Sequence, residues 1–287
     1  MTNNIQSKLF CLIILVVLMT NTAWANLMLA PQRVVFEERQ RSASVHLVNT
    51  SNSTTTYRLH WVQKKQAENG KYIDLPDNSD EVPNASRMLR FSPRQVTLAP
   101  NERQTVRIAL RRKKGLTEGE YRSHLLFQAL PKEDGDLEPA SRGAKIKINL
   151  LLGFSIPVIV RQGKPDVQVK ISDVELRKQK IKNKTHYGAY ITLRRSGLHT
   201  AYGSLRVIWK SNRHSGQKEI AILNNVSFYP DSEKVKFFAG FKDFKPGPGQ
   251  IKVEYVGAEK YDGHTFDAIK TAANHSSFKL ETIMAAQ

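Results

Sequence analysis

The feature that most constrains the fold is the segment from Arg142 to Arg161, which reads as one very long β-strand. Its first half alternates aliphatic side chains with Lys145, Lys147 and Asn149, which is the period of two that is typical of a strand. Continued to Val160, the run is about three times the usual strand length of roughly 5 to 6 residues. Its polar residues argue against a membrane span, which needs about 18 nearly uninterrupted apolar residues.

The pattern is compatible with two locations of this strand in a sheet. It could cross the middle of a sheet and bury its aliphatic side chains in the protein's own core. Alternatively, it lies at a sheet edge and offers those side chains to another chain, with backbone hydrogen bonds for affinity and alternate side chains for specificity. Pro157 has no N–H for a ladder and favours the second position. The side chains in question are Ile146, Ile148, Leu150 and Leu152.

Residues 1–25 have the pattern of a cleaved secretory signal peptide. Lys8 precedes an apolar run from Leu9 to Met19, and the segment ends in Ala-Trp-Ala at Ala25. We therefore expect an exported protein that begins at Asn26. Cleavage would remove Cys11, the only cysteine, so the folded state must rest on core burial without disulfides.

The formal net charge of +18 would ordinarily suggest a nucleic acid or another anionic partner. Export argues against nucleic acid, and no face interleaves basic residues with aromatics as single-strand binding requires. The basic runs Arg111–Lys114 and Arg177–Lys182 are interpreted as solvated turns that protect strand edges.

Patterns of enzyme chemistry are not found. None of the eight histidines has the spacing of a zinc site, and the serines lack the context of a catalytic nucleophile. We therefore predict no catalytic residues, no metal, no cofactor and no small-molecule substrate.

Residues 26–160 read as a first all-β domain of seven strands. Strands are predicted at 28–36, 43–47, 57–61, 89–98, 106–110 and 119–130, followed by the long strand, and a polar loop is expected from Lys64 to Arg87. Trp61 is placed inward on the third strand, and Tyr121 is in position for a tyrosine corner. These features predict an immunoglobulin-like sandwich whose seventh strand lies at an edge.

Residues 161–282 read as a second, smaller and more polar all-β sandwich, with 283–287 as a tail. A hinge is predicted at Arg161–Pro165, because Gly and Pro interrupt the strand pattern there. Strands are expected at 167–171, 187–193, 205–209, 219–223, 234–238 and 250–256.

Five sequence blocks in the first domain carry a resemblance. In their order and spacing they resemble the periplasmic pilus chaperones of the chaperone-usher pathway, and the second and fourth look most like the archaic branch. The match covers nearly all of residues 26–161. The blocks are Pro31–Phe36, Arg90–Arg94, Leu98–Arg107, Gly119–Leu125 and Phe154–Pro157.

The resemblance implies a fold, a location and a mechanism. It implies two immunoglobulin-like domains joined at an angle with a cleft between them, in the periplasm. The partners would be pilin subunits, which lack their last strand, and an outer-membrane usher. The four aliphatic residues from Ile146 to Leu152 would enter the groove of the incomplete subunit. Self-pairing of this strand in the resting state is a further hypothesis.

The resemblance also implies basic side chains that anchor the subunit's terminal carboxylate in the cleft. Arg33 stands at the place of the family's arginine, and a guanidinium matches the two oxygens of a carboxylate. The family's second anchor, a lysine late in the seventh strand, is absent, and Leu152 or Gly153 stands there. Arg90 and Arg122 are the candidates to replace it.

A secreted adhesive or carbohydrate-binding sandwich is the alternative function. It predicts aromatic side chains exposed on a sheet face or a loop. Trp61 and Trp209 fall at inward positions instead, and only Tyr72 lies in an obvious loop. A third reading, in which the chain is itself a pilin, needs an extended N-terminal donor segment and the absence of a seventh strand, and the sequence shows neither feature.

Overall fold

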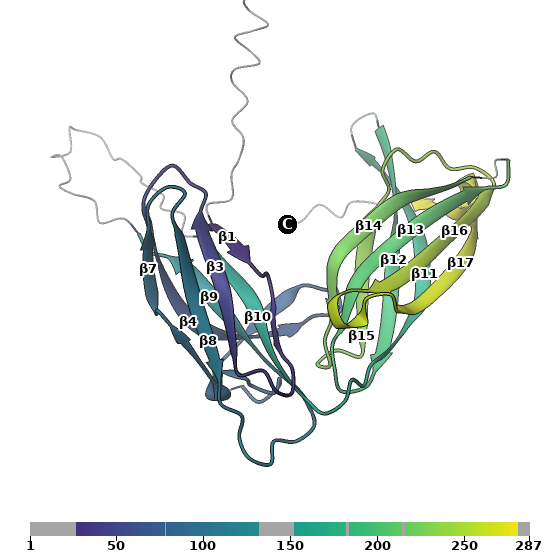
Figure 1. The fold of residues 1–287 in the computed structure, drawn as a ribbon. Coiled ribbons are helices and arrows are strands. Elements are labelled where there is room, and N and C mark those ends of the chain that lie inside the picture. The colour runs from purple at the N-terminus through teal and green to yellow at the C-terminus, as the bar shows by residue number, and fades with distance from the viewer. Residues whose placement is uncertain (1–26, 78, 132–151, 182–183, 214–215, 281–287) are drawn as a thin grey trace, which may run out of the picture.

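The structure is a computed structural model that describes residues 27–77, 79–131, 152–181, 184–213 and 216–280. Two β-sandwiches lie side by side at an angle, the first built from the N-terminal half of the chain and the second from the C-terminal half (Figure 1). The predicted all-β fold of two sandwich domains is confirmed. The predicted signal peptide lies outside the described residues.

The first sandwich packs two sheets face to face around a core that includes Phe36, Leu47, Tyr57, Ile108 and Phe127. One sheet has the strand order β1-β3-β8-β6 and the other β2-β10-β9-β4-β5, with β7 also paired to β4. The strands are β1 (Leu27–Ala30), β2 (Val34–Phe36), β3 (Ser42–Asn49), β4 (Thr55–Gln66), β5 (Tyr72–Leu75), β6 (Leu89–Ser92), β7 (Gln95–Leu98), β8 (Arg103–Leu110), β9 (Gly119–Ala129) and β10 (Gly153–Gln162).

Two segments that were each predicted to form one continuous strand instead form two strands, one in each sheet. The strand expected at 28–36 breaks at Pro31, so that β1 pairs with β3 and β2 pairs with β10. The strand expected at 89–98 breaks at Pro93, so that β6 pairs with β8 and β7 pairs with β4. Proline cannot donate to a ladder, and here each proline marks a crossing from one sheet to the other.

Two predictions about the aromatic residues of this sandwich are confirmed. The Tyr121 hydroxyl donates to the Thr117 carbonyl at 3.1 Å, which is the tyrosine corner. Trp61 packs against the core, with its ring 5.3 Å from that of Phe91 in an edge-to-face arrangement.

The predicted loop from Lys64 to Arg87 is wrong in its first half. β4 continues to Gln66, and β5 pairs antiparallel with Gln63–Gln66, so the segment forms a hairpin. The short run Tyr72–Leu75 is surrounded by polar residues, and its faces are mostly exposed, so it carries little hydrophobic periodicity.

The second sandwich has the sheet orders β15-β12-β11-β18 and β14-β13-β16-β17. Its strands are β11 (Gln168–Ile181), β12 (Lys184–Ser196), β13 (Ala201–Ser211), β14 (Gln217–Phe228), β15 (Lys234–Gly240), β16 (Gly249–Gly257), β17 (Thr265–Ala273) and β18 (Lys279–Leu280). All six predicted strands are found, and β17 and β18 were not predicted. The basic run that begins at Arg177 was predicted as a turn, but through Ile181 it belongs to β11, paired with β12.

The helical residues of the described chain are three single turns, at Ser86–Met88, Glu259–Tyr261 and His275–Ser277. None of the helices in these ranges is long and apolar enough to cross a membrane.

Candidate functional site

A buried ion pair joins the two sandwiches. Arg122 of β9 donates from both terminal nitrogens to the two carboxylate oxygens of Asp231, each at 2.9 Å. The side chains are 2% and 4% exposed. Arg122 also donates to the carbonyl of Lys64 at 3.0 Å, and its guanidinium lies 3.7 Å from the centre of the Tyr229 ring. Burial lowers the pKa of Arg122, but the bonds to Asp231 outweigh it and the net direction is upward.

The β4–β5 hairpin reaches across the same boundary. The backbone N–H of Gln66 donates to Asp231 at 2.8 Å, and its side-chain amide donates to the Ser227 carbonyl at 2.9 Å. The backbone N–H of Tyr229 donates back to the Gln66 amide oxygen at 3.2 Å. Part of the segment predicted to be a polar loop therefore contacts the second domain.

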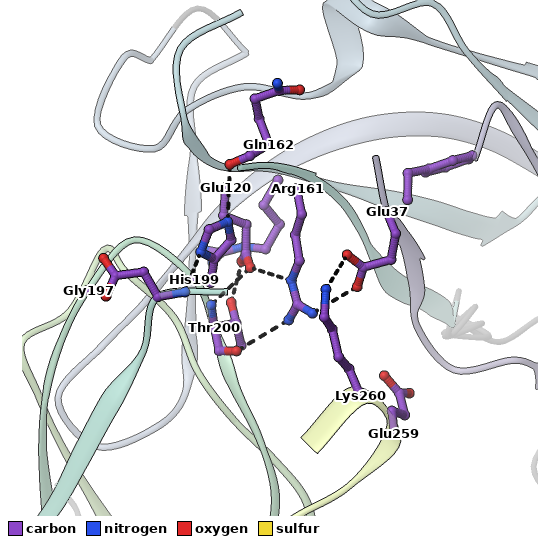
Figure 2. Close-up of polar contacts among 12 residues, drawn as sticks. Glu37, Glu120, Arg161, Gln162, Gly197, His199, Thr200, Glu259 and Lys260 are labelled. Carbon is purple, nitrogen blue, oxygen red and sulfur yellow. Dashed lines mark hydrogen bonds and ion pairs between the residues drawn. The ribbon is translucent and has the colours of Figure 1, made fainter. Parts of the chain in front are cut away.

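A second cluster of polar side chains connects the two sandwiches near the predicted hinge, as Figure 2 shows. Arg161, the last buried residue of β10 before the hinge, donates to Glu37 at 3.1 Å and to Glu120 at 3.4 Å. Glu120 in turn accepts the backbone N–H of Thr200 at 2.9 Å. Burial raises the pKa of Glu37, but Lys260, at 2.9 Å, and Arg161 hold it below the ordinary value.

A cavity of about 640 Å³ opens between the two sandwiches. The first domain contributes β1, the turn after it and the first half of β10, and the second domain contributes β13 and the end of β14. Arg33 is the one charged residue among the described residues that line it. The wall consists of Leu27, Met28, Leu29, Gln32, Arg33, Thr50, Tyr72, Phe154, Ser155, Ile156, Pro157, Tyr202, Asn225, Ser227 and Tyr229.

Arg33 lies in this wall with unused hydrogen-bond donors. The residue is 7% exposed, and its guanidinium stacks 3.8 Å from the centre of the Tyr202 ring. None of its three side-chain nitrogens has a hydrogen-bond partner in the described chain. Its one ion pair is long, 3.8 Å to the half-exposed carboxylate of Glu259. Buried donors are normally satisfied, so this guanidinium is suited to bind a carboxylate that enters the cavity.

The other two predicted anchors lie elsewhere. Arg90 is exposed on β6, outside the cavity wall, and donates to the carbonyl of Leu89. Arg122 lies behind the ring of Tyr229, and its two terminal nitrogens already bond to Asp231 and Lys64. The structure therefore brings Arg33 alone of the three into the wall.

The first half of β10 is a free edge of its sheet in the described chain. β9 pairs with β10 along its whole length, but β2 pairs only with Val158–Val160. On the face of β10 that packs into the core, burial decreases toward the start of the strand. Val160 and Val158 are fully buried, Phe154 is half-buried, and Leu152 is 40% exposed. The remaining predicted donor residues, Ile146, Ile148 and Leu150, lie outside the described residues.

His124 is a buried base next to the cavity that sequence reasoning missed. Neither ring nitrogen has a partner in the described ranges, and the ring lies 5.2 Å from that of Tyr72. Burial, with added repulsion from Arg122 and Lys64, lowers its pKa well below the ordinary 6.5.

No group of three or more His, Cys, Asp or Glu side chains in the described part of the chain could hold a metal ion.

Comparison with known proteins gives one family match. Residues 26–165 match the family described as pili and flagellar-assembly chaperone, PapD N-terminal domain. No curated protein matches the chain.

Several solved structures are similar at low identity. The CupB2 chaperone of Pseudomonas aeruginosa is 14% identical, with 86% of this chain and 99% of that chain covered and a TM-score of 0.43. A chain of the CsuC–CsuE chaperone–tip adhesion subunit complex of Acinetobacter baumannii, from archaic chaperone-usher pili, is 15% identical, with 86% and 98% covered and a TM-score of 0.42. A chain of the Salmonella enterica SafA pilin–SafB chaperone complex is 16% identical, with 88% and 98% covered and a TM-score of 0.41.

Proposed function

We propose that the protein is a periplasmic chaperone that binds incomplete pilin subunits by lending them a strand, on the premise that residues 26–165 match the pili and flagellar-assembly chaperones. It would cap each subunit and deliver it to an outer-membrane usher.

The observation that carries the proposal is the falling burial along β10. The core-facing row of apolar residues leads back along β10 to Leu152, which directly precedes the strand and is 40% exposed, and the edge of residues 153–157 that faces away from β9 has no partner strand in the described chain. A monomeric protein gains nothing from an unpaired apolar edge, which invites aggregation. A partner that lacks a strand would bury it by strand addition.

The proposed donor residues Ile146, Ile148 and Leu150 have the same even numbering as Leu152 and would extend its face if the strand continues. Burial of four such side chains would contribute about 6 to 12 kcal/mol, at about 1.5 to 3 kcal/mol each, before the cost of ordering. This is enough to hold a subunit that cannot complete its own fold.

Arg33 is proposed to bind the subunit's terminal carboxylate. Its donors are buried and have no hydrogen-bond partner in the described chain, and Arg33 lines the cavity that β10 borders. A carboxylate there would form charge-assisted hydrogen bonds and would fix where the subunit strand ends along the β10 edge.

Co-expression with a pilin encoded by a neighbouring gene, followed by a pull-down, tests the proposal. The protein should keep the pilin soluble and bound. The double variant Ile148→Asn, Leu150→Asn should lose capture, whereas Ile181→Asn, a control at an exposed apolar residue of the second domain, should retain it. Pilin solubility that is the same with and without this protein would refute the chaperone function.

The carboxylate contact is tested by a second pair of variants. Arg33→Ala should weaken the complex by about tenfold or more, because hydrogen bonds to charged groups contribute about 1.5 to 3 kcal/mol. Arg90→Ala removes an exposed arginine of the same domain and should leave the affinity near that of the wild type. Equal affinity of the wild type and both variants for the pilin would show that Arg33 does not bind the carboxylate.

A further inference from the structure

One outer sheet face of the first sandwich carries arginines without any acidic residue. The four strands of the sheet β1-β3-β8-β6 contain three arginines and no Asp, Glu or Lys. Side chains alternate between the two faces of a strand, and the fully buried residues of β8 have even numbers. The exposed Arg103 and Arg107 therefore lie on the outer face. Arg90 of β6 lies there too, because it is exposed and pairs with Ala109. We call these three residues the arginine face.

The sheet register brings the arginines close to one another. Arg90 is opposite Ala109, so it is a diagonal neighbour of Arg107 at about 7 to 8 Å. Arg103 lies four residues from Arg107 along the same strand, or about 14 Å at about 3.4 Å per residue. None of the three forms an ion pair within the described residues. Their positive charges repel one another, and an anionic partner would relieve this repulsion.

The residues around the arginines favour a phosphate surface over a protein interface. Ser44 and Ser92 lie opposite Arg107 on the two neighbouring strands, and the other outward residues of β8 are Thr105 and Ala109. The core of a protein interface is instead rich in aromatic residues and depleted of charge. A guanidinium binds phosphate with two parallel hydrogen bonds. The export predicted from the sequence leaves phospholipid, not nucleic acid, as the polyanion.

We propose that the arginine face binds the phosphate headgroups of an anionic phospholipid bilayer. The contacts that Gln66 and Arg122 make with the second domain come from the other sheet of the sandwich, and none of the three arginines lines the cavity between the domains. The bilayer and the proposed pilin subunit would therefore use different surfaces. Because the attraction is electrostatic and exposed, added salt should weaken it.

Co-sedimentation with lipid vesicles tests the inference on the full chain as purified after export. The wild type should sediment with vesicles of equal parts phosphatidylcholine and phosphatidylglycerol, but not with phosphatidylcholine alone. The triple variant Arg90→Gln, Arg103→Gln, Arg107→Gln should bind the anionic vesicles about a hundredfold more weakly, because each basic residue near such a surface contributes about fivefold.

A matched control removes the same net charge from the second domain. The variant Arg194→Gln, Lys210→Gln, Lys270→Gln changes three exposed strand residues and should bind the anionic vesicles nearly as well as the wild type. Equal weakening in the two variants would show that net charge drives the binding, and it would overturn the inference. A wild type that binds neither kind of vesicle overturns it as well.

Two further measurements separate the bilayer from a protein partner and from the proposed function. If the triple variant loses an acidic protein in a pull-down but binds vesicles as the wild type does, the face is a protein interface and the inference is wrong. The triple variant should capture the pilin as well as the wild type, which also shows that its fold is intact. Failure of the vesicle experiment thus leaves the chaperone function standing.

Discussion

Replacing Asp231 by Ala should destabilise the protein more than the loss of any exposed ion pair can. Its carboxylate accepts two hydrogen bonds from Arg122 and one from the backbone of Gln66, all at 2.8 to 2.9 Å. The variant would leave a guanidinium that is 2% exposed without its counter-ion. Removing one partner of a buried pair costs about 3 to 5 kcal/mol, because the remaining charge is uncompensated.

Urea unfolding monitored by fluorescence measures this loss, since Trp61 reports on the first sandwich and Trp209 on the second. Glu219→Ala is the matched control. Its partner Arg206 lies at 2.7 Å, but the two side chains are 42% and 37% exposed, so the expected cost is below about 1 kcal/mol.

A double variant distinguishes the loss of a counter-ion from a general defect in packing. Arg122→Met combined with Asp231→Leu removes both charges and should recover much of the stability, because a buried pair is often replaced by apolar residues at little cost. The reasoning is refuted if Asp231→Ala costs no more than Glu219→Ala, or if the double variant is less stable than the single one.

Two further predictions concern single residues. His124 is neutral in the fold, whereas in the unfolded chain it takes up a proton as the pH falls below about 6.5, so stability present above that pH should be lost on acidification by up to about 1.4 kcal/mol per pH unit. His124→Gln should show a smaller fall between roughly pH 7 and pH 5 in urea unfolding, and an equal fall would contradict the assignment. Tyr121→Phe should cost about 1 kcal/mol by losing the bond to Thr117, and unchanged thermal stability would show that the tyrosine corner contributes nothing.

Strand positions are predicted best from the sequence where one face of the strand is buried and the other is exposed. β8, with its buried residues at alternate positions, follows the period of two and was placed correctly. The β4–β5 hairpin was missed because β5 is mostly exposed and shows no periodicity of two, and because the contacts of Gln66 with the second domain leave no trace in the local sequence pattern. The same holds for the pairing of Arg122 with Asp231, which lie 109 residues apart. Nothing adjacent to either residue in the sequence indicates its partner.

Arg33 could be singled out from the sequence only by resemblance, but its position follows from the crossing between the sheets. The chain leaves the first sheet at Pro31 and enters the second at Val34, which pairs with Val158. Residues 153–157 of β10 therefore lack a partner on that side among the described residues, and Arg33 stands at the end of this unpaired stretch. The passage of the chain from the first sheet to the second, between Pro31 and Val34, thus determines both where the edge of β10 is free and where the proposed anchor Arg33 lies.

If a partner strand binds this edge with its terminal carboxylate at Arg33, as proposed, its direction follows from the geometry. A chain that ends at Arg33 and follows the free edge back toward Gly153 runs in the same direction as β10, so it pairs in parallel, as β2 does. Its register is then set by the distance from its carboxylate, and a shift of one residue turns every side chain to the opposite face.

Adding one residue to the C terminus of the pilin should therefore impair capture more than a substitution of its last residue that keeps the length. The added residue either removes the carboxylate from Arg33 or turns the aliphatic contacts away from β10. Competition between the extended and the native pilin in one co-expression would measure the difference. Equal capture of the two would show that the carboxylate does not set the register.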